Sequence, residues 1–517
     1  MVAPRARWSA QNDENFKKII IEINMEKKNY IVAIDIGSSE VVVAVATLTE
    51  EGNISIVTIV SEPTREGMTA GMVDNSQLVA EALRKARQRA EQEAAITITD
   101  AYVGISGKFV RCARYVDHVF VADAENRISE SDLMALSERM RNVKAADGEV
   151  IMDFYPLNYK GDAGTEMKNP VGCYSKQLSS TYNFILCEHV AKDRLRRVFL
   201  DAGIKIREIF AGAAVVADSV VTTDEKEDGV AVVDLGGGVT DVAVYHNGAL
   251  GYIASIPMGG AAVNADIRCF NGHIPPRTIE NLKCQCGSAV VDLTPDEVIQ
   301  VRSRSRAIKP ISRLNLAAVI EARMTDIAEY VWREICDSGY SKKLGAGIVL
   351  TGGVAALKNV ADLFSRVTGQ EVRVACAEIG VQTESLEKVS TPNLTLAVSL
   401  LQRGAKLGAC PVGVFIPSAK PEPKPAPKAE PQPQPTPKVE PEQQPVEPIA
   451  APQPQPEPQP APAAPKVEPE DDGDDIVDGT EDIVKPSGLS RIGSWFKRAL
   501  SDAFPAPDDE DDGDDEY

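Results

Sequence analysis

The sequence lacks any apolar run of about 18 residues, the length that a membrane-spanning helix requires. Its first apolar stretch, Ile19 to Ile21, is interrupted by Glu22, so the beginning of the chain does not have the pattern of a signal peptide. Nine cysteines are scattered along the 517 residues, and with the four histidines they form no metal-ligand spacing. Free thiols in a reducing cytosol are the simplest interpretation.

Broad basic faces are also missing, which excludes nucleic acid as an expected partner. The net charge is −21, but 24 acidic and only 9 basic residues lie from Lys420 onward. Most of the excess negative charge therefore belongs to a tail. Hydrophobic residues make up 43% of the chain, enough for a large core in the remainder, and the length allows about three domains.

Two segments of the chain share a strand–turn–strand pattern. In the first, an apolar run at residues 30–35 ends in Asp35, a glycine and two serines follow, and a second strand covers residues 41–48. In the second, the run at residues 230–234 ends in Asp234, three glycines follow, and a strand covers residues 240–245. This spacing predicts two copies of one domain rather than a solenoid.

The pattern suits a polyphosphate. A turn of small residues lets backbone N–H groups approach phosphate oxygens closely, and a carboxylate at the end of the preceding strand can hold a hydrated Mg²⁺. A single glycine-rich turn is more often an ordinary turn, but two that face each other would contact a polyphosphate from both sides. The expected phosphate-binding residues are Gly37, Ser38, Ser39, Gly236, Gly237, Gly238 and Thr240, and the expected Mg²⁺-associated carboxylates, acting through water, are Asp35 and Asp234.

A third apolar run, at residues 344–350, ends in Thr351 and three residues expected to contact adenosine, namely Gly352, Gly353 and Val354. Glycine there would bring the backbone flat against a ring or ribose, and the same turn is expected to start a helix whose N-terminus favours phosphate. Residues 359–368 are expected to follow as a helix. The order of two phosphate hairpins and an adenosine turn is typical of the actin, hexokinase and 70-kDa heat-shock superfamily. This resemblance implies an α/β, two-lobed, actin-like ATPase fold that binds ATP and Mg²⁺.

Within that superfamily the chain resembles the bacterial cell-division family FtsA from about residue 30 to about residue 403. The resemblance rests on residues 232–245, 346–354 and 156–172, and on the linker and amphipathic helix that follow the body. It implies an extra subdomain, called 1C, at residues 107–187, used for head-to-tail self-assembly and for contact with later division proteins. A merely stabilising insertion is the alternative.

The resemblance also implies two roles in a subdomain called 2B. Glu280 and Lys283, spaced i and i+3 on one helix face, would face ribose and adenine. The basic strip Arg302, Arg304 and Arg306 would bind the acidic C-terminal peptide of the tubulin-like protein FtsZ. A solvated surface pair and an ordinary charged run are the respective alternatives.

The expected division of the chain follows from these matches. It comprises an N-terminal extension (1–27), lobe 1 (28–106), subdomain 1C (107–187), a return to lobe 1 (188–228), lobe 2 (229–258), subdomain 2B (259–335), the rest of lobe 2 (336–390), an interlobe helix (391–416), a linker (417–487), a membrane helix (488–504) and an acidic tail (505–517).

Proline is concentrated in the linker, where 20 of the 34 prolines lie between Pro417 and Pro469. Such a composition predicts extended polyproline geometry without a packed core. The following helix, residues 488–504, carries apolar residues at helical spacing and basic residues beside them, which favours an in-plane membrane anchor over a helix that docks on a partner protein. The anchoring residues are Leu489, Ile492, Trp495, Phe496, Leu500 and Phe504.

The chain departs from the family at the second interlobe helix, where Ser399 replaces the usual glycine and Leu396 the usual threonine. No residue is singled out as a general base, so we expect at most slow ATP hydrolysis. The predicted function is an ATP-binding protein that polymerises on the inner face of the cytoplasmic membrane and tethers FtsZ filaments at the division septum. The alternatives are a pilus-assembly relative, a chaperone-type ATPase and a metabolite kinase.

Overall fold

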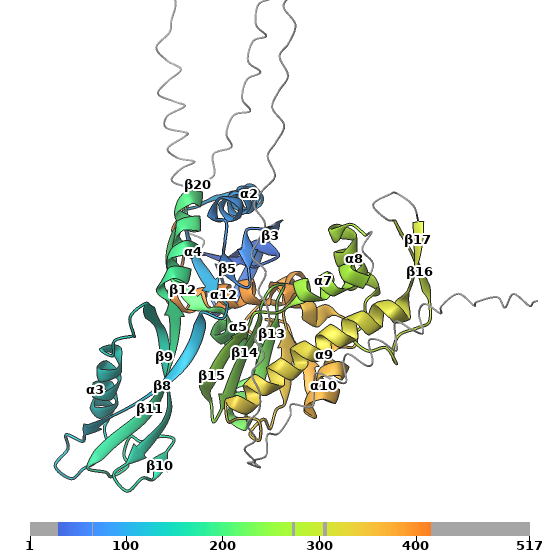
Figure 1. Ribbon diagram of the computed structural model, residues 1–517. Helices are drawn as coiled ribbons and strands as arrows, with labels where there is room; N and C mark the ends of the chain where they lie inside the picture. Colours follow the sequence, from blue (N-terminus) through green and yellow to red (C-terminus); the bar gives the residue numbers. More distant parts are fainter. Residues whose placement is uncertain (1–28, 65, 271–273, 303–307, 415–517) are drawn as a thin grey trace, which may run out of the picture. The chain divides into compact units, whose positions relative to one another are not determined.

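The computed structural model describes residues 29–64, 66–270, 274–302 and 308–414. Its framework is a pair of five-stranded sheets with the same construction (Figure 1). The first has the order β12-β7-β1-β2-β3 and the second the order β15-β14-β13-β18-β19. In each sheet, three consecutive strands pair antiparallel. Two further strands extend the sheet in parallel on the other side of the first of these three. The predicted duplication of one domain is therefore confirmed.

The strands of the first sheet are β1 (Tyr30–Ile36), β2 (Glu40–Leu48), β3 (Ile54–Pro63), β7 (Asp100–Ile105) and β12 (Lys205–Ala211). Those of the second are β13 (Val230–Leu235), β14 (Thr240–His246), β15 (Ala249–Ile256), β18 (Ile348–Thr351) and β19 (Val372–Val374). The central strands β1, β2, β13 and β14 are almost entirely buried, which explains why their sequences are continuous apolar runs rather than alternating ones.

Helices cover the outer faces of both sheets. On the first, α2 (Ser76–Ala94) packs against β2, β3 and α4 (His189–Ala202). The α2 helix begins where the Asn75 side chain accepts from two backbone N–H groups, and it buries a stripe that includes Val79, Leu83 and Ala86. On the second, α9 (Arg313–Asp337) packs against α7 (Gly260–Phe270) and α10 (Val360–Thr368).

Two helices connect the sheets. The α5 helix (Gly212–Val220) packs on β13 and β14, and α12 (Thr395–Leu407) packs on β1, β2 and β7. They contact each other through Ser219 and Ser399, whose hydroxyl groups form a hydrogen bond. Ser399 is buried and its hydroxyl also lies 2.7 Å from the Thr395 carbonyl oxygen. Ser399 is thus accommodated by a polar contact between the two helices.

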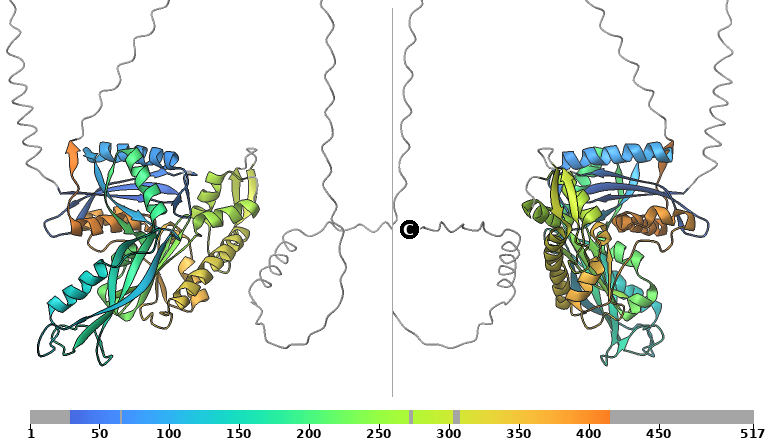
Figure 2. Two further views of the ribbon diagram at one scale, coloured as in Figure 1. Left: turned by 60° about the vertical axis from the view of Figure 1, so that its left-hand side comes forward. Right: turned by 90° about the vertical axis from the view of Figure 1, so that its right-hand side faces the viewer.

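A four-stranded antiparallel sheet with one helix is inserted between β7 and α4, and we call it the arm. It consists of β8 (Val110–Phe120), α3 (Glu130–Arg141), β9 (Glu149–Gly161), β10 (Glu166–Met167) and β11 (Gln177–Glu188), in the order β10-β9-β11-β8. Figures 1 and 2 show the arm projecting beside β15. Contact with the second sheet includes a hydrogen bond of 3.0 Å from Asn183 Nδ2 to the Leu250 carbonyl oxygen.

The remaining elements are short. They are β4 (Met68–Thr69), β5 (Met72–Val73), β6 (Ile96–Ile98), α6 (Thr223–Asp228), α8 (Pro276–Cys286), β16 (Val298–Arg302), β17 (Ile308–Ser312), the 3₁₀ turns η1 (Gly353–Ala356), η2 (Thr383–Ser385) and η3 (Pro392–Leu394), α11 (Leu386–Val389) and β20 (Val412–Val414).

The turn at Gly352 starts a single 3₁₀ turn, η1, rather than the expected α-helix, whereas the helix expected at residues 359–368 is confirmed as α10. The third apolar run also forms a shorter strand than its length indicates, since Gly347 adopts a left-handed φ of 68° just before β18. The expected N-terminal extension, proline-rich linker, membrane helix and acidic tail lie outside the described residues. Among the residues that are described, no helix is long and apolar enough to cross a membrane.

Candidate nucleotide site

The two predicted phosphate turns lie directly against each other. Each closes in the same way, with the first glycine donating its N–H to a carbonyl three residues on: Gly37 to Glu40 and Gly236 to Val239, both at 2.9 Å. A Cβ atom on Gly237 would lie 2.1 Å from Ser39 Oγ. A side chain at that position would require the Ser39 hydroxyl to rotate away, so the two turns are in contact at Gly237 and Ser39.

Neighbouring segments hold both turns in place. The first residues of α7 donate to the second turn, Gly260 N–H to the Gly236 carbonyl at 3.0 Å and Ala261 N–H to the Gly237 carbonyl at 2.7 Å. Thr240, predicted to donate to phosphate, is buried and donates its hydroxyl to the Met258 carbonyl at 2.9 Å. On the first turn, the Ser38 carbonyl accepts from the Thr64 hydroxyl at 2.9 Å.

Three carboxylates lie at the ends of the strands that carry the turns. Burial, with Glu40 and Asp241 nearby, raises the pKa of Asp35 to about 7. Burial, with Asp241 and Asp35 nearby, raises the pKa of Asp234 to about 8. Burial also raises the pKa of Asp241 to about 6, although a hydrogen bond from Ser255 acts in the opposite direction. Mutual repulsion of this kind favours a bound cation.

These residues suit a hydrated ion rather than a directly ligated one. Within the described part of the chain, no three carboxylate, histidine or cysteine side chains are close enough together to hold a metal ion. Mg²⁺ keeps several of its waters in most protein sites, so carboxylates acting through water fit its chemistry. When bound with a nucleotide, the ion would supply positive charge to the phosphates, while Asp35 and Asp234 would orient its waters.

The predicted adenosine turn packs against the second phosphate hairpin. Gly352 has a φ of 85°, and a Cβ atom there would lie 2.2 Å from Asp234 Oδ1. Gly353, in contrast, has space for a Cβ, with its nearest contact at 3.6 Å. Val354 is buried, and a Cβ on Gly260 would lie 2.9 Å from its Cγ2. The turn therefore meets both β13 and the start of α7.

Glu280 and Lys283 also lie beside the start of α7. Both are on α8, and their side chains form an ion pair of 2.8 Å, as the i and i+3 spacing predicts. The Lys283 ammonium is buried and lies 3.4 Å from the Gly260 carbonyl oxygen. Burial acts to raise the pKa of Glu280, but Lys283 and a hydrogen bond from Asn264 lower it overall.

The predicted basic strip of Arg302, Arg304 and Arg306 is not seen to contribute to the candidate nucleotide site. Arg302 is exposed at the end of β16, opposite Ile308 of β17, while Arg304 and Arg306 lie outside the described residues. The six membrane-anchor residues, Leu489 to Phe504, also lie outside them.

Sequence reasoning missed Asp241, which is more deeply buried than either predicted carboxylate. A signal was available, because Asp241 is the one charged residue of the apolar strand β14. A carboxylate inside a strand that is otherwise buried is costly unless it has a partner or a role.

Comparison with known proteins finds relatives of this chain. The family model "Cell division protein FtsA" matches residues 231–399. The cell division protein FtsA of Buchnera aphidicola is 30% identical over 396 residues, which cover 74% of this chain and 93% of that protein. The FtsA of Escherichia coli K12 is 31% identical over 392 residues, covering 74% and 92%. Among solved structures, the PilM–PilN type IV pilus biogenesis complex aligns with a TM-score of 0.49 and 15% identity, covering 72% of this chain and 98% of that one.

The two FtsA proteins match this chain along almost their whole length. The chain therefore belongs to the FtsA family of cell division proteins.

Proposed function

We propose that this protein binds ATP with Mg²⁺ between its two phosphate turns and, in that state, polymerises on the inner face of the cytoplasmic membrane. The assembled protein tethers FtsZ filaments to the membrane at the division septum and helps to recruit later division proteins. The observation that carries this proposal is the contact between the Gly37–Ser39 and Gly236–Gly238 turns, each preceded by a carboxylate whose pKa is raised.

The turns come from different sheets, and this supports a nucleotide-dependent role. A polyphosphate that contacts both turns would stabilise one arrangement of the two lobes, and only a ligand that distinguishes two arrangements can shift their populations. The α5 and α12 helices connect the two sheets and contact each other at Ser219 and Ser399. A change in the arrangement of the lobes would therefore alter the contact between these helices.

Two further parts of the proposal come from the sequence and family membership. The arm would serve head-to-tail assembly. The helix at residues 488–504 would lie in the membrane interface, with Trp495 and Phe496 among its inserted residues. One such helix followed by the acidic residues 508–516 binds anionic lipid weakly, and polymerisation would add affinity by multivalency.

Sedimentation with vesicles tests this proposal. Vesicles of mixed anionic and zwitterionic lipid are pelleted with the full chain and FtsZ, with and without Mg·ATP. We expect FtsZ to pellet with the vesicles when the protein and Mg·ATP are both present. Trp495→Glu should release both proteins into the supernatant, whereas the conservative change Trp332→Phe, at a half-buried position of α9, should leave pelleting unchanged. Equal pelleting by the Trp495→Glu variant would contradict the membrane anchor.

A further inference from the structure

A groove of about 450 Å³ lies on the arm, between α3 and β9. None of its residues belongs to the nucleotide site. It arises because α3 packs on β8 and β11 and leaves β9 uncovered on the same face of the sheet. Every residue of β9 keeps some solvent exposure, whereas β11 alternates between buried and half-buried positions before becoming fully buried. The arm therefore has an apolar face that its single helix only partly covers.

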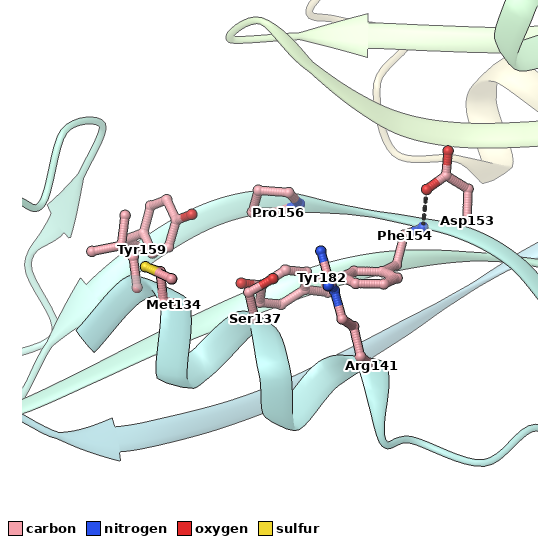
Figure 3. Close-up of a pocket in the computed structure, with 9 residues that line it drawn as sticks. Met134, Ser137, Arg141, Asp153, Phe154, Pro156, Tyr159 and Tyr182 are labelled. Atoms are coloured by element: carbon pink, nitrogen blue, oxygen red, sulfur yellow. Dashed lines mark hydrogen bonds between the residues drawn. The ribbon is translucent and has the colours of Figure 1, made fainter. Parts of the chain in front are cut away.

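Aromatic rings form the floor of this groove. Figure 3 shows Phe154 and Tyr182 lying between α3 and β9, with Pro156 and Tyr159 along the strand. The ring centroids of Phe154 and Tyr182 are 5.9 Å apart, and Phe154 stacks on Phe184 at 5.3 Å. On the helix side the wall includes Met134, which is 71% exposed. The floor is rigid because it is continuous with the core of the arm.

The groove is lined by one cation, Arg141, and by one carboxylate, Asp153, which accepts a hydrogen bond of 2.6 Å from the Tyr155 hydroxyl and lies 3.7 Å from Arg403. Arg141 extends from the last turn of α3 toward β9, beside the rings of Tyr182 and Phe154 (Figure 3). Within the described part of the chain it forms no ion pair, unlike the nearby Arg139, which pairs with Asp117 at 2.7 Å. An exposed guanidinium beside aromatic rings is suited to a ligand that combines apolar rings with a carboxylate.

The strand that borders the groove is poorly suited to adding another strand. Pro156 has no N–H to donate, and the pairing of β9 with β11 is irregular at two places, next to Tyr182 and next to Ile185. An occupant that adds main-chain hydrogen bonds in register is therefore disfavoured. Polyproline peptides need no such ladder, since they dock by inserting their rings between aromatic side chains.

The chain itself contains a segment of this chemistry. Residues 452–460 read Pro-Gln-Pro-Gln-Pro-Glu-Pro-Gln-Pro, with one acid, Glu457, in the middle. We propose that the groove between α3 and β9 binds the proline-rich segment of a second copy of this chain, with the proline rings on Phe154 and Tyr159 and the Glu457 carboxylate at Arg141. Such a contact would link neighbouring copies through their proline-rich segments and would add to any assembly made by the folded bodies.

Fluorescence anisotropy with a labelled peptide of residues 451–461 tests this proposal on the full chain. Arg141→Glu should weaken binding about fivefold, as expected for reversal of an exposed charge pair, and Met134→Glu should weaken it several-fold by placing a charge on the apolar wall. Phe120→Ala, 75% exposed on β8 of the same arm, is the matched control and should bind like the unmodified protein. Every variant carries its own proline-rich segment, which competes with the labelled peptide for the groove. This competition is the same in all the proteins compared.

The peptide supplies the reciprocal test. A Glu457→Lys peptide should bind the Arg141→Glu variant more tightly than the native peptide does, and a peptide with alanine in place of every proline should not bind. Native-peptide binding that is absent, or unaffected by both groove variants, would overturn the proposal, as would equal binding of the alanine peptide. Mg·ATP binding is measured on the same variants and should be unchanged, so loss of peptide binding alone leaves the proposed nucleotide function intact.

Discussion

At the scale of single residues, the carboxylates beneath the phosphate turns make stability depend on pH. The pKa of Asp35 is raised to about 7 and that of Asp234 to about 8, from an ordinary value of 3.8. Between about pH 4 and about pH 8 the folded chain therefore holds more protons than the unfolded chain, and the free energy of unfolding falls as pH rises. Each retained proton contributes a slope of about 1.4 kcal/mol per pH unit.

We therefore expect the nucleotide-free protein to lose stability from pH 5.5 to pH 8, and Asp234→Asn to reduce this loss. Urea unfolding at several pH values measures both. Asp292→Asn, at a side chain that is 82% exposed, is the control and should keep the slope of the unmodified protein. A slope that is the same in all three proteins would show that the carboxyl of Asp234 does not retain its proton.

Gly352 gives a second prediction at this scale. Alanine at Gly352 would adopt a φ of 85° and place its Cβ 2.2 Å from Asp234 Oδ1. Gly369→Ala meets the same backbone strain, with a φ of 69°, but has nothing within 4 Å of the added Cβ. We expect Gly369→Ala to lower the free energy of unfolding by about 1–2 kcal/mol and Gly352→Ala to lower it further and to weaken Mg·ATP binding. Equal effects would mean that the contact with Asp234 is readily relaxed.

At the scale of elements, the hairpins were predictable because strand, carboxylate and small-residue turn are contiguous in the sequence. The α-helix expected to start at the Gly352 turn was wrong, since the four residues of η1 cannot be distinguished by composition from the start of an α-helix, but the helix expected at residues 359–368 is confirmed by α10. The pairing of β6 with β20 joins residues more than 300 positions apart, and no local pattern indicates it. The contact of Asn183 with the Leu250 carbonyl is long-range in the same way, and no pattern within either strand signals it.

A further prediction at this scale concerns FtsZ binding by the segment that joins β16 and β17. Replacing Arg302, Arg304 and Arg306 with alanine should weaken binding of an acidic FtsZ C-terminal peptide, because it removes three positive charges from one segment. The loss should be larger at 20 mM salt than at about 150 mM, where the Debye length is about 8 Å. The matched control removes arginines outside the hairpin, Arg333 and Arg366. An unchanged affinity at low salt would show that the hairpin charges do not contact the peptide.

At the scale of the whole molecule, the duplication was visible in the sequence because Asp35 and Asp234 end equivalent strands. The facing of the two turns was expected from the repeated strand–turn–strand pattern, and in the structure Gly237 and Gly238 contact Ser39 and Ser38. Asp241 was missed because β14 is buried on both faces, so no alternation singles out one position. The tail regions were assigned from composition alone, and they lie outside the described residues.

Because the two phosphate turns belong to different sheets, nucleotide binding is a property of the whole body, and calorimetric titration of Mg·ATP into the full chain tests it most directly. The control is Gly52→Ala, in a turn where an added Cβ contacts nothing within 4 Å. We expect measurable binding by the unmodified protein and by Gly52→Ala, and binding reduced at least about tenfold, or by about 1.4 kcal/mol, in a folded Gly237→Val variant. Affinity in Gly237→Val equal to that of the unmodified protein would contradict the assignment of these turns to the phosphates.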